Sequence, residues 1–251
     1  MRTVLLSELT WPEVRELLAS GQVDTAVVAV GATEQHGPHL PLGTDAILAQ
    51  AIGERVAKGL GRALLAPPVV VGRSDHHMAF PGSLTMRQET LAAVLDDYVA
   101  SLKRHGFANM VLLPTHGGNF GPLAQIAAAL REAHPEVNIV GYTDLDRLIR
   151  ALYAASARFD VSAEAAGAHS GESETSMMLA LRPDLVHMEK AKLGYVGSQE
   201  GLAPAVFARG IGALDPDGVL GDARLATAPK GDVYVRDFAN DVLEWVRPLL
   251  R

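Results

Sequence analysis

Six of the nine histidines lie in segments rich in glycine, serine and acidic residues. The densest of these segments, GATEQHGPHLPLGTD, contains Glu34, His36 and Asp45. Glu34 and His36 are two residues apart, so in an extended chain both side chains point to the same side. Carboxylates and imidazoles together form the ligand set of zinc, manganese and ferrous iron. The segment therefore predicts a metal site; the alternative is a polar surface loop in which Asp45 caps a helix.

A second segment, THGGN, contains His116, Gly117, Gly118 and Asn119 and follows a short apolar run. Paired glycines let a backbone approach a ligand closely, and we expect His116 to meet the ligands of the first segment. A phosphate-binding loop is the alternative, because we expect a helix to begin at Pro122. The segment has no lysine and no Ser or Thr of the Walker type, which weakens that alternative.

A third segment, HSGESETS, places His169 before two acids, Glu172 and Glu174, at the start of an expected helix. Acids in a first helical turn also occur simply because they interact favourably with the helix dipole, so this alternative remains open. His169 is a candidate general acid or base, since the ordinary pKa of imidazole lies near neutrality. Met177 and Met178, further along the helix, are predicted core residues.

A fourth segment, SDHHMAFPGS, is a long polar loop that we expect to line a pocket, with Ser74 and His77 within it. A serine hydrolase triad built on Ser74 is a weak alternative, because no Gly-x-Ser-x-Gly pattern surrounds this serine.

Apolar runs of strand length alternate with amphipathic segments in the first 150 residues. Strands are expected at residues 25–30, 63–71, 110–113 and 137–142. Helices are expected at residues 44–58 with Gly59 as the stop, from a capping box at Thr85 and Gln88 to Gly106, at 122–133, and through Leu145, Leu148, Ile149 and Leu152. Such repeated units predict an α/β fold with a mostly parallel sheet covered on both faces. The polar segments would then lie at the carboxyl edge of the sheet, where such folds bind ligands.

The composition changes from Gly194 to Gly231. This segment contains eight glycines and has weak apolar periodicity, which predicts loops and short strands. A terminal helix is expected at residues 233–246. Neither a repeat nor a linker divides the sequence, so we expect a single domain over residues 1–251.

The composition excludes several classes of protein. The 251 residues are 48% hydrophobic and 20% charged, which predicts a full core and excludes disorder. The net charge of −7 argues against nucleic acid as a main partner. The absence of cysteine excludes disulfides, iron–sulfur clusters and thiol nucleophiles. With no signal peptide and no apolar stretch of about 18 residues, we expect a soluble cytoplasmic protein that does not enter a membrane.

The motifs GATEQHGPHLPLGTD, PTHGGNFGPL and HSGESETSMML, in this order and spacing, resemble those of the creatininase (creatinine amidohydrolase) family. The resemblance implies a three-layer α/β/α metallohydrolase, usually a homohexamer, with two divalent ions that activate a shared water. It implies that Glu34 and His116 hold one ion, that His36 holds the other and that Asp45 bridges them. His169 matches the family's catalytic histidine, which helps to protonate the departing nitrogen.

One departure from the family pattern concerns the second ion. Creatininase carries a metal-binding glutamate at the position of Gly118, and an acid at the position of Ala168. We therefore predict that Glu174 replaces the missing ligand and takes part in catalysis. The Gly-Gly form resembles a broader branch of the family, which includes a formylaminopyrimidine deformylase, a mycofactocin-precursor peptidase and a keto-inositol hydrolase.

The expected function is metal-dependent hydrolysis of a cyclic amide or formamide C–N bond in a small molecule, with zinc, manganese or iron as the ions. The residues expected to contact the substrate are Ser74, His77, Gly117, Gly118 and Asn119. The alternatives are a peptidase of the same family, a hydrolase of a keto-sugar-like ring, and a non-catalytic metal- or ligand-binding protein. His169 speaks against the last, because metal binding alone would not need it.

Overall fold

A computed structural model describes residues 1–198 and 201–251. Within these residues one parallel sheet has the strand order β2-β1-β3-β4. The strands are β1 (Thr25–Val30), β2 (Ala63–Leu65), β3 (Asn109–Pro114) and β4 (Asn138–Gly141). Every residue of β1 and β3 is buried, as expected for parallel strands covered on both faces. The predicted α/β fold with a parallel sheet is confirmed.

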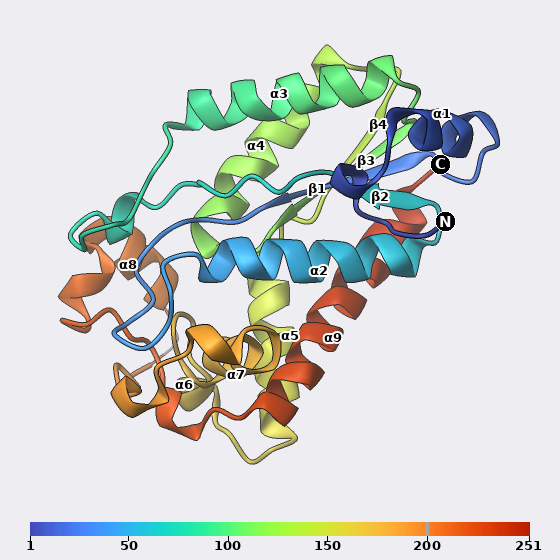
Figure 1. Cartoon of the computed structure of the whole chain (residues 1–251). Helices are drawn as coiled ribbons and strands as arrows, with labels where there is room; N and C mark the ends of the chain where they lie inside the picture. The colour runs from blue at the N-terminus through green and yellow to red at the C-terminus, as the bar shows by residue number, and fades with distance from the viewer. Residues whose placement is uncertain (199–200) are drawn as a thin grey trace.

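Helices cover both faces of the sheet, which gives the three layers seen in Figure 1. One face carries α1 (Trp11–Ala19), α3 (Gln88–Arg104) and α4 (Gly117–Ala133). The other carries α2 (Thr44–Leu60), α5 (Leu145–Ala157), α7 (Glu172–Leu181) and α9 (Ala228–Val246). Alternate residues of β1 separate into the two buried apolar clusters, Val28 with the first group of helices and Val27 with the second.

Shorter helices join these elements. They are α6 (Ala163–Ala166), α8 (Leu202–Arg209) and the 3₁₀ segments η1 (Leu6–Glu8), η2 (Asp75–His77), η3 (Pro183–Leu185), η4 (Met188–Lys190), η5 (Ile211–Ala213), η6 (Ala223–Leu225) and η7 (Arg247–Leu249). None of the described helices is long and apolar enough to cross a membrane.

The predicted boundaries of α2 and α4 are wrong. Helix α2 continues past Gly59 to Leu60, and the residue that ends it is Gly61, whose φ of +79° is a left-handed conformation that suits glycine. Helix α4 begins at Gly117, with two residues between it and the end of the strand at Pro114, so Pro122 lies inside the helix rather than at its first position. The paired glycines Gly117 and Gly118 therefore form the first turn of a helix and not a loop.

A predicted strand and a predicted helix cap also differ from the structure. The strand expected at residues 63–71 stops at Leu65, and only an isolated bridge from Val69 to Val30 continues it, since the two intervening prolines cannot donate to the ladder. Thr85 does not cap α3. Its hydroxyl accepts a hydrogen bond from the Ser74 amide at 3.0 Å, and the helix begins at Gln88.

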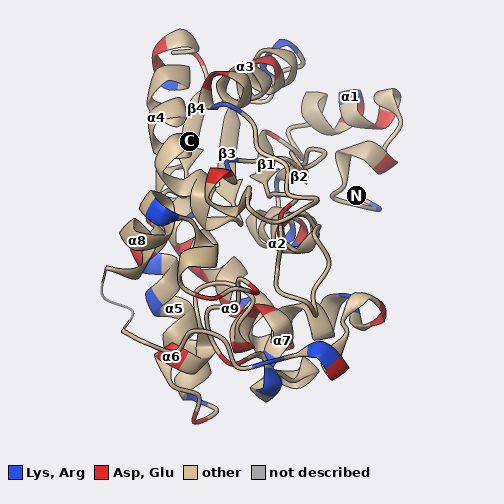
Figure 2. Ribbon diagram, turned by 90° about the vertical axis from the view of Figure 1, so that its left-hand side faces the viewer, with Lys and Arg blue, Asp and Glu red and all other residues tan. Residues whose placement is uncertain are grey.

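The glycine-rich segment 194–231 contains helix α8, which was not predicted, and isolated bridges in place of short strands. The terminal helix begins at Ala228, five residues earlier than expected, because Pro229 occupies the start of the helix, where its missing N–H costs nothing. The four strands carry no Asp, Glu, Lys or Arg, so charged side chains lie on helices and loops (Figure 2).

Candidate metal centre

The strand order determines where a ligand crevice forms. From β1 the chain passes through α2 to β2 on one side, whereas β3 pairs with β1 on the other. The last residues of β1 and β3, Val30 and Pro114, are partners in register. Parallel sheets bind ligands at such a switch point, outside the carboxyl ends of the two strands. The polar segments predicted to meet follow these two strand ends.

Three of the predicted ligands are positioned by β1 and α2. Glu34 and His36 lie in the irregular segment after β1, and Asp45 lies in the first turn of α2. Helix α2 approaches the end of β1 so closely that a Cβ at Gly31 would lie 2.6 Å from the Asp45 carbonyl oxygen. Glycine at this position is what permits Asp45 to face the centre.

His116, His169 and Glu174 reach the centre from other elements. His116 caps α4 directly after β3, and Glu174 lies in the first turn of α7, preceded by the loop that carries His169. Glu174 accepts a hydrogen bond from the Ser170 amide at 2.5 Å, which directs its carboxylate toward His36.

The neighbouring acid Glu172 turns away from the centre. It is fully buried and accepts hydrogen bonds from Ser176 Oγ at 2.8 Å and from the Tyr234 hydroxyl at 3.1 Å. Glu172 therefore ties α7 to α9, and of the two acids only Glu174 faces the metal centre.

The candidate ligand atoms form two groups that share Asp45, while a third group joins His169 to Glu34 and His36. In the first group His116 Nδ1 lies 3.1 Å from Glu34 Oε1 and 3.4 Å from Asp45 Oδ2. In the second, His36 Nε2 lies 3.5 Å from Asp45 Oδ1 and 3.8 Å from Glu174 Oε2. Within each group the ligand atoms are all within 4.8 Å of one another. Each oxygen of Asp45 thus faces a different group, as a carboxylate that bridges two cations would.

Several of these atoms are buried without a hydrogen-bond partner among the described residues: both carboxylate oxygens of Glu34, Nε2 of His36 and Oδ2 of Asp45. The three side chains are at most 1% exposed. Burial of unpaired polar or charged atoms is costly, by about 1–3 kcal/mol for a neutral group and more for a charged one. The arrangement therefore fits divalent cations, which would satisfy these atoms together.

The second nitrogen of each ligand histidine is held by a backbone carbonyl. His36 Nδ1 donates to the Glu34 carbonyl at 3.1 Å, and His116 Nε2 donates to the Arg73 carbonyl at 2.9 Å. Such contacts fix the tautomer and the ring orientation of metal-binding histidines. They leave Nε2 of His36 and Nδ1 of His116 directed at the carboxylates.

The pKa values reflect the negative charge at the centre. Burial by itself lowers the pKa of His36, but Asp45 and Glu174 outweigh it and raise that pKa to about 9. The pKa of His116 is raised well above its ordinary value because Glu34 and Asp45 outweigh burial. Burial, together with Asp45 and Glu34, raises the pKa of Glu174 to about 7. The electrostatic potential of the buried carboxylates therefore favours a positive charge at the centre.

His169 is buried beside the first group. Its Nε2 donates to the Gln35 carbonyl at 2.8 Å, and its Nδ1 lies 3.8 Å from Glu34 Oε1. Burial, with His36 and His77 nearby, lowers the pKa of His169 well below its ordinary value. The imidazole is thus neutral at pH 7 and can accept a proton.

Gln35 is a residue of the centre that sequence reasoning missed. Its side-chain Oε1 accepts from the Gly37 amide at 2.9 Å, so its Nε2 is the atom that lies 3.0 Å from His77 Nδ1. His77 Nε2 in turn lies 3.3 Å from Glu34 Oε1. The only available signal was the position of Gln35 between two ligands, and strand-like alternation would place it on the opposite side.

The residues expected to contact substrate separate in the structure. His77 and Gly117 line the cavity beside the centre. Ser74 does not line the cavity; it is buried, with a hydroxyl that has no partner among the described residues. Asn119 is fully engaged, because its amide donates to the Gly31 carbonyl at 3.0 Å and accepts from the Arg73 amide at 2.9 Å. These hydrogen bonds hold α4 against the end of β1.

Gly118 has no room for a side chain. A Cβ at this position would lie 2.2 Å from the Arg73 carbonyl oxygen and 2.4 Å from Nε2 of His116. The hydrogen bond between these two groups occupies the space that a ligand at position 118 would need. Position 118 therefore cannot carry a ligand side chain without a shift of its neighbours, and Glu174 of α7 is the acid that lies in the second group.

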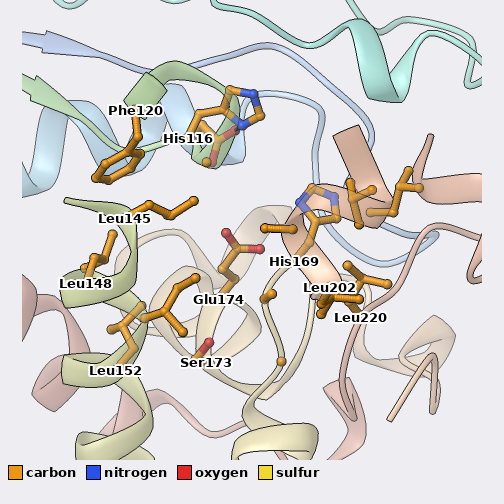
Figure 3. Close-up of a pocket in the computed structure, with 18 of the residues that line it drawn as sticks. His116, Phe120, Leu145, Leu148, Leu152, His169, Ser173, Glu174, Leu202 and Leu220 are labelled. Atoms are coloured by element: carbon orange, nitrogen blue, oxygen red, sulfur yellow. Dashed lines mark ion pairs between the residues drawn. The ribbon is translucent and has the colours of Figure 1, made fainter. Parts of the chain in front are cut away.

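A cavity of about 250 Å³ opens beside the centre. Asp45, His116, His169 and Glu174 line one part of it. Figure 3 shows Glu174 between His169 on one side and the leucines of α5 on the other. A small organic molecule in this cavity would reach both ligand groups.

Comparison with known proteins relates the chain to one family of hydrolases. The family model described as "Creatininase: Creatinine amidohydrolase" matches residues 7–246. The "Mycofactocin precursor peptide peptidase" of Mycolicibacterium smegmatis is 31% identical over 230 residues, which cover 90% of this chain and 85% of the relative. The "Creatinine amidohydrolase" of Pseudomonas putida is 29% identical over 264 residues, with 98% and 97% covered. A solved structure named "Creatininase Mn" is 25% identical, covers 98% of both chains and superposes with a TM-score of 0.80.

Proposed function

The chain belongs to the creatininase family and is a hydrolase of carbon–nitrogen bonds, and we propose that it cleaves an amide-like bond of a small molecule with two divalent metal ions. The observation that carries the proposal is the position of Asp45 between two ligand groups, one oxygen toward each. A single structural cation would need only one of these groups.

We assign one ion to Glu34 and His116 and the other to His36 and Glu174, with Asp45 shared. When bound, such a pair of ions supplies Lewis-acid polarisation of a carbonyl and lowers the pKa of water. A donor set of imidazoles and carboxylates suits zinc, manganese and ferrous iron. The chain's own residues contribute the fixed orientation of these ligands.

His169 is the proposed proton carrier of the reaction. In hydrolysis, the oxygen of water bonds to the carbonyl carbon, the C–N bond breaks, and the nitrogen leaves with a proton. His169 is neutral at pH 7 because its pKa is lowered, so Nδ1 can accept the proton of water and deliver it to the departing nitrogen. The Gln35 carbonyl holds the other ring nitrogen and so fixes which nitrogen faces the reaction. Glu174, which lines the same cavity and belongs to the second ligand group, is proposed to take part in catalysis as well as to hold an ion.

A short peptide is the second candidate substrate. It is favoured by the 31% identity to a relative named as a peptide peptidase and by a cavity that continues beyond the ligand groups. For a small amide and for a peptide alike, His77 and Gly117 are proposed to contact the substrate, because both line the cavity. Ser74 is also proposed as a substrate contact. A single domain over the chain, a homohexamer and a cytoplasmic location complete the proposal.

Metal content and amide cleavage test the function together. We expect about two divalent ions per chain by elemental analysis of protein purified without chelator. Release of free amine from a panel of formamides, cyclic amides and dipeptides, lost on chelation and restored by zinc or manganese, supports hydrolysis. Protein that binds neither ion even after incubation with both metals contradicts the assignment.

A further inference from the structure

Beyond the ligand groups, the cavity has a wall that the hydrolysis of a small polar amide would not use. This wall consists of apolar side chains from α5 and the helices beside it: Phe120, Leu145, Leu148, Ile149, Leu152 and Met177. Figure 3 shows the leucines of α5 on one side of Glu174, directed into the cavity. Leu145, Ile149 and Leu152 are only partly buried, although the spacing of α5 suits a fully covered helix face.

Two hydroxyls beside this wall are already engaged in hydrogen bonds. The Ser173 hydroxyl donates to the Ala166 carbonyl at 3.1 Å, and the Thr115 hydroxyl donates to the Asp45 carbonyl at 2.8 Å. No Lys or Arg is present among the described residues that line the cavity. A negatively charged tail on a ligand would therefore find no counter-ion here, whereas an apolar group would remove apolar surface from water.

The wall is continuous with the centre rather than a separate groove. Glu174 and His116 line the same cavity as Leu145 and Leu148, and Met177 follows Glu174 by one turn on α7. A molecule whose amide lies at the ligand groups thus extends a neighbouring substituent along α5.

We propose that this wall is an apolar subsite, and that the natural substrate carries an aliphatic or aromatic group next to the C–N bond that is cleaved. This inference rests on the proposed function, because the ligand groups place the reactive end of the molecule. It assigns Leu145, Ile149 and Leu152 as specificity-determining residues. Small polar amides would reach the centre but leave the wall in contact with water.

A series of alkyl hydroxamates tests the subsite without any knowledge of the substrate. The hydroxamate group chelates divalent metals, and the alkyl chain reports on its surroundings. Titration calorimetry on the full chain loaded with zinc should show affinity rising about fourfold for each methylene from acetohydroxamate to hexanohydroxamate, as burial of a methylene predicts. Adipic monohydroxamate, which ends in a carboxylate, should lose most of this gain.

Two variants and a control locate the effect on α5. Leu145→Asn should reduce the ratio of hexanohydroxamate to acetohydroxamate affinity several-fold. Ile149→Phe fills the cavity and should shift the best chain to a shorter one. Ala154→Asn, exposed on the same helix and outside this cavity, should leave the ratio unchanged.

The outcomes separate the two proposals. If acetohydroxamate binds but longer chains add nothing, the apolar subsite is wrong and the metal centre stands. If the protein takes up no zinc and therefore binds no hydroxamate, the metal centre itself is wrong, and the substrate class falls with it. The wild-type series decides this even if a variant fails to fold.

Discussion

The side-chain amide of Gln35 lies 3.0 Å from Nδ1 of His77 and can only donate a hydrogen bond to it. His77 must therefore carry its own proton on Nε2, which faces Glu34 at 3.3 Å. Gln35 thus orients a buried histidine toward a carboxylate of the metal centre.

Replacement of Gln35 should reverse this tautomer. In Gln35→Glu the side chain still accepts from the Gly37 amide but no longer donates to His77, so the ring proton should move to Nδ1. The ¹⁵N chemical shifts of the His77 ring report this change directly. Gln35→Met should also lower the free energy of unfolding by about 1–3 kcal/mol, because two buried partners lose their hydrogen bonds. An unchanged His77 spectrum in Gln35→Glu would refute the assigned role.

Removal of Asp45 should empty both ion sites. Its two oxygens face different ligand groups, so Asp45→Ala deprives each group of one carboxylate. We expect less than one ion per chain by elemental analysis and no hydrolysis. Asp146→Ala is the matched control, because Asp146 is an exposed acid that lines the same cavity without facing the centre. Full occupancy in Asp45→Ala would exclude a shared carboxylate.

The two adjacent glycines of α4 should respond differently to a methyl group. Gly118→Ala would bring a Cβ within 2.2 Å of the Arg73 carbonyl oxygen, so His116 or the backbone must move. We expect a loss of about 1–3 kcal/mol in the free energy of unfolding and weaker binding of one ion. At Gly117 the same Cβ meets nothing within 4 Å, so Gly117→Ala should change stability by less than about 0.5 kcal/mol. Urea unfolding and metal analysis of both variants measure the contrast.

Metal affinity should fall as the pH falls. The raised pKa values of His36, about 9, and of His116 mean that both rings hold a second proton at pH 7 until a cation displaces it. Below these pKa values, the affinity for the metal should drop about tenfold per unit fall in pH for each imidazole that must release a proton on binding the metal. Calorimetry in buffers of different ionisation enthalpy measures the protons released. Metal binding without proton release at pH 7 would contradict these pKa shifts.

His169 should matter for turnover and not for metal binding. Once a substrate is found, His169→Ala should retain about two ions per chain while kcat falls by about a hundredfold or more, as loss of a general acid or base does. His105→Ala, exposed at the end of α3, is the control and should leave kcat unchanged. If His169→Ala instead loses metal, the residue is a ligand, as its distance of 3.8 Å to Glu34 would also allow.

The boundaries that sequence reasoning missed share a cause. Thr85 has the chemistry of a helix cap but serves the Ser74 amide, and Pro122 has that of a first helical residue but lies within α4. For Thr85, a tertiary hydrogen bond overrides the local preference for capping. For Pro122, the helix has already begun at Gly117, next to His116. Helix α8 was missed because its segment is glycine-rich and its apolar residues pack on distant loops.

Apolar runs in the sequence predict three of the four strands closely, the parallel fold class, and the polar segments that follow the strand ends. Continuous apolar runs have one stable place in such a fold, the middle of a covered sheet, and the polar segments that follow them must meet at its carboxyl edge. The packing of distant elements sets how Gln35 contacts His77, how Glu172 pairs with Tyr234 of α9, and how the apolar stripe of α5 lines a cavity. Those outcomes depend on the rotation and approach of helices from distant parts of the chain, to within about an ångström, which local spacing does not encode.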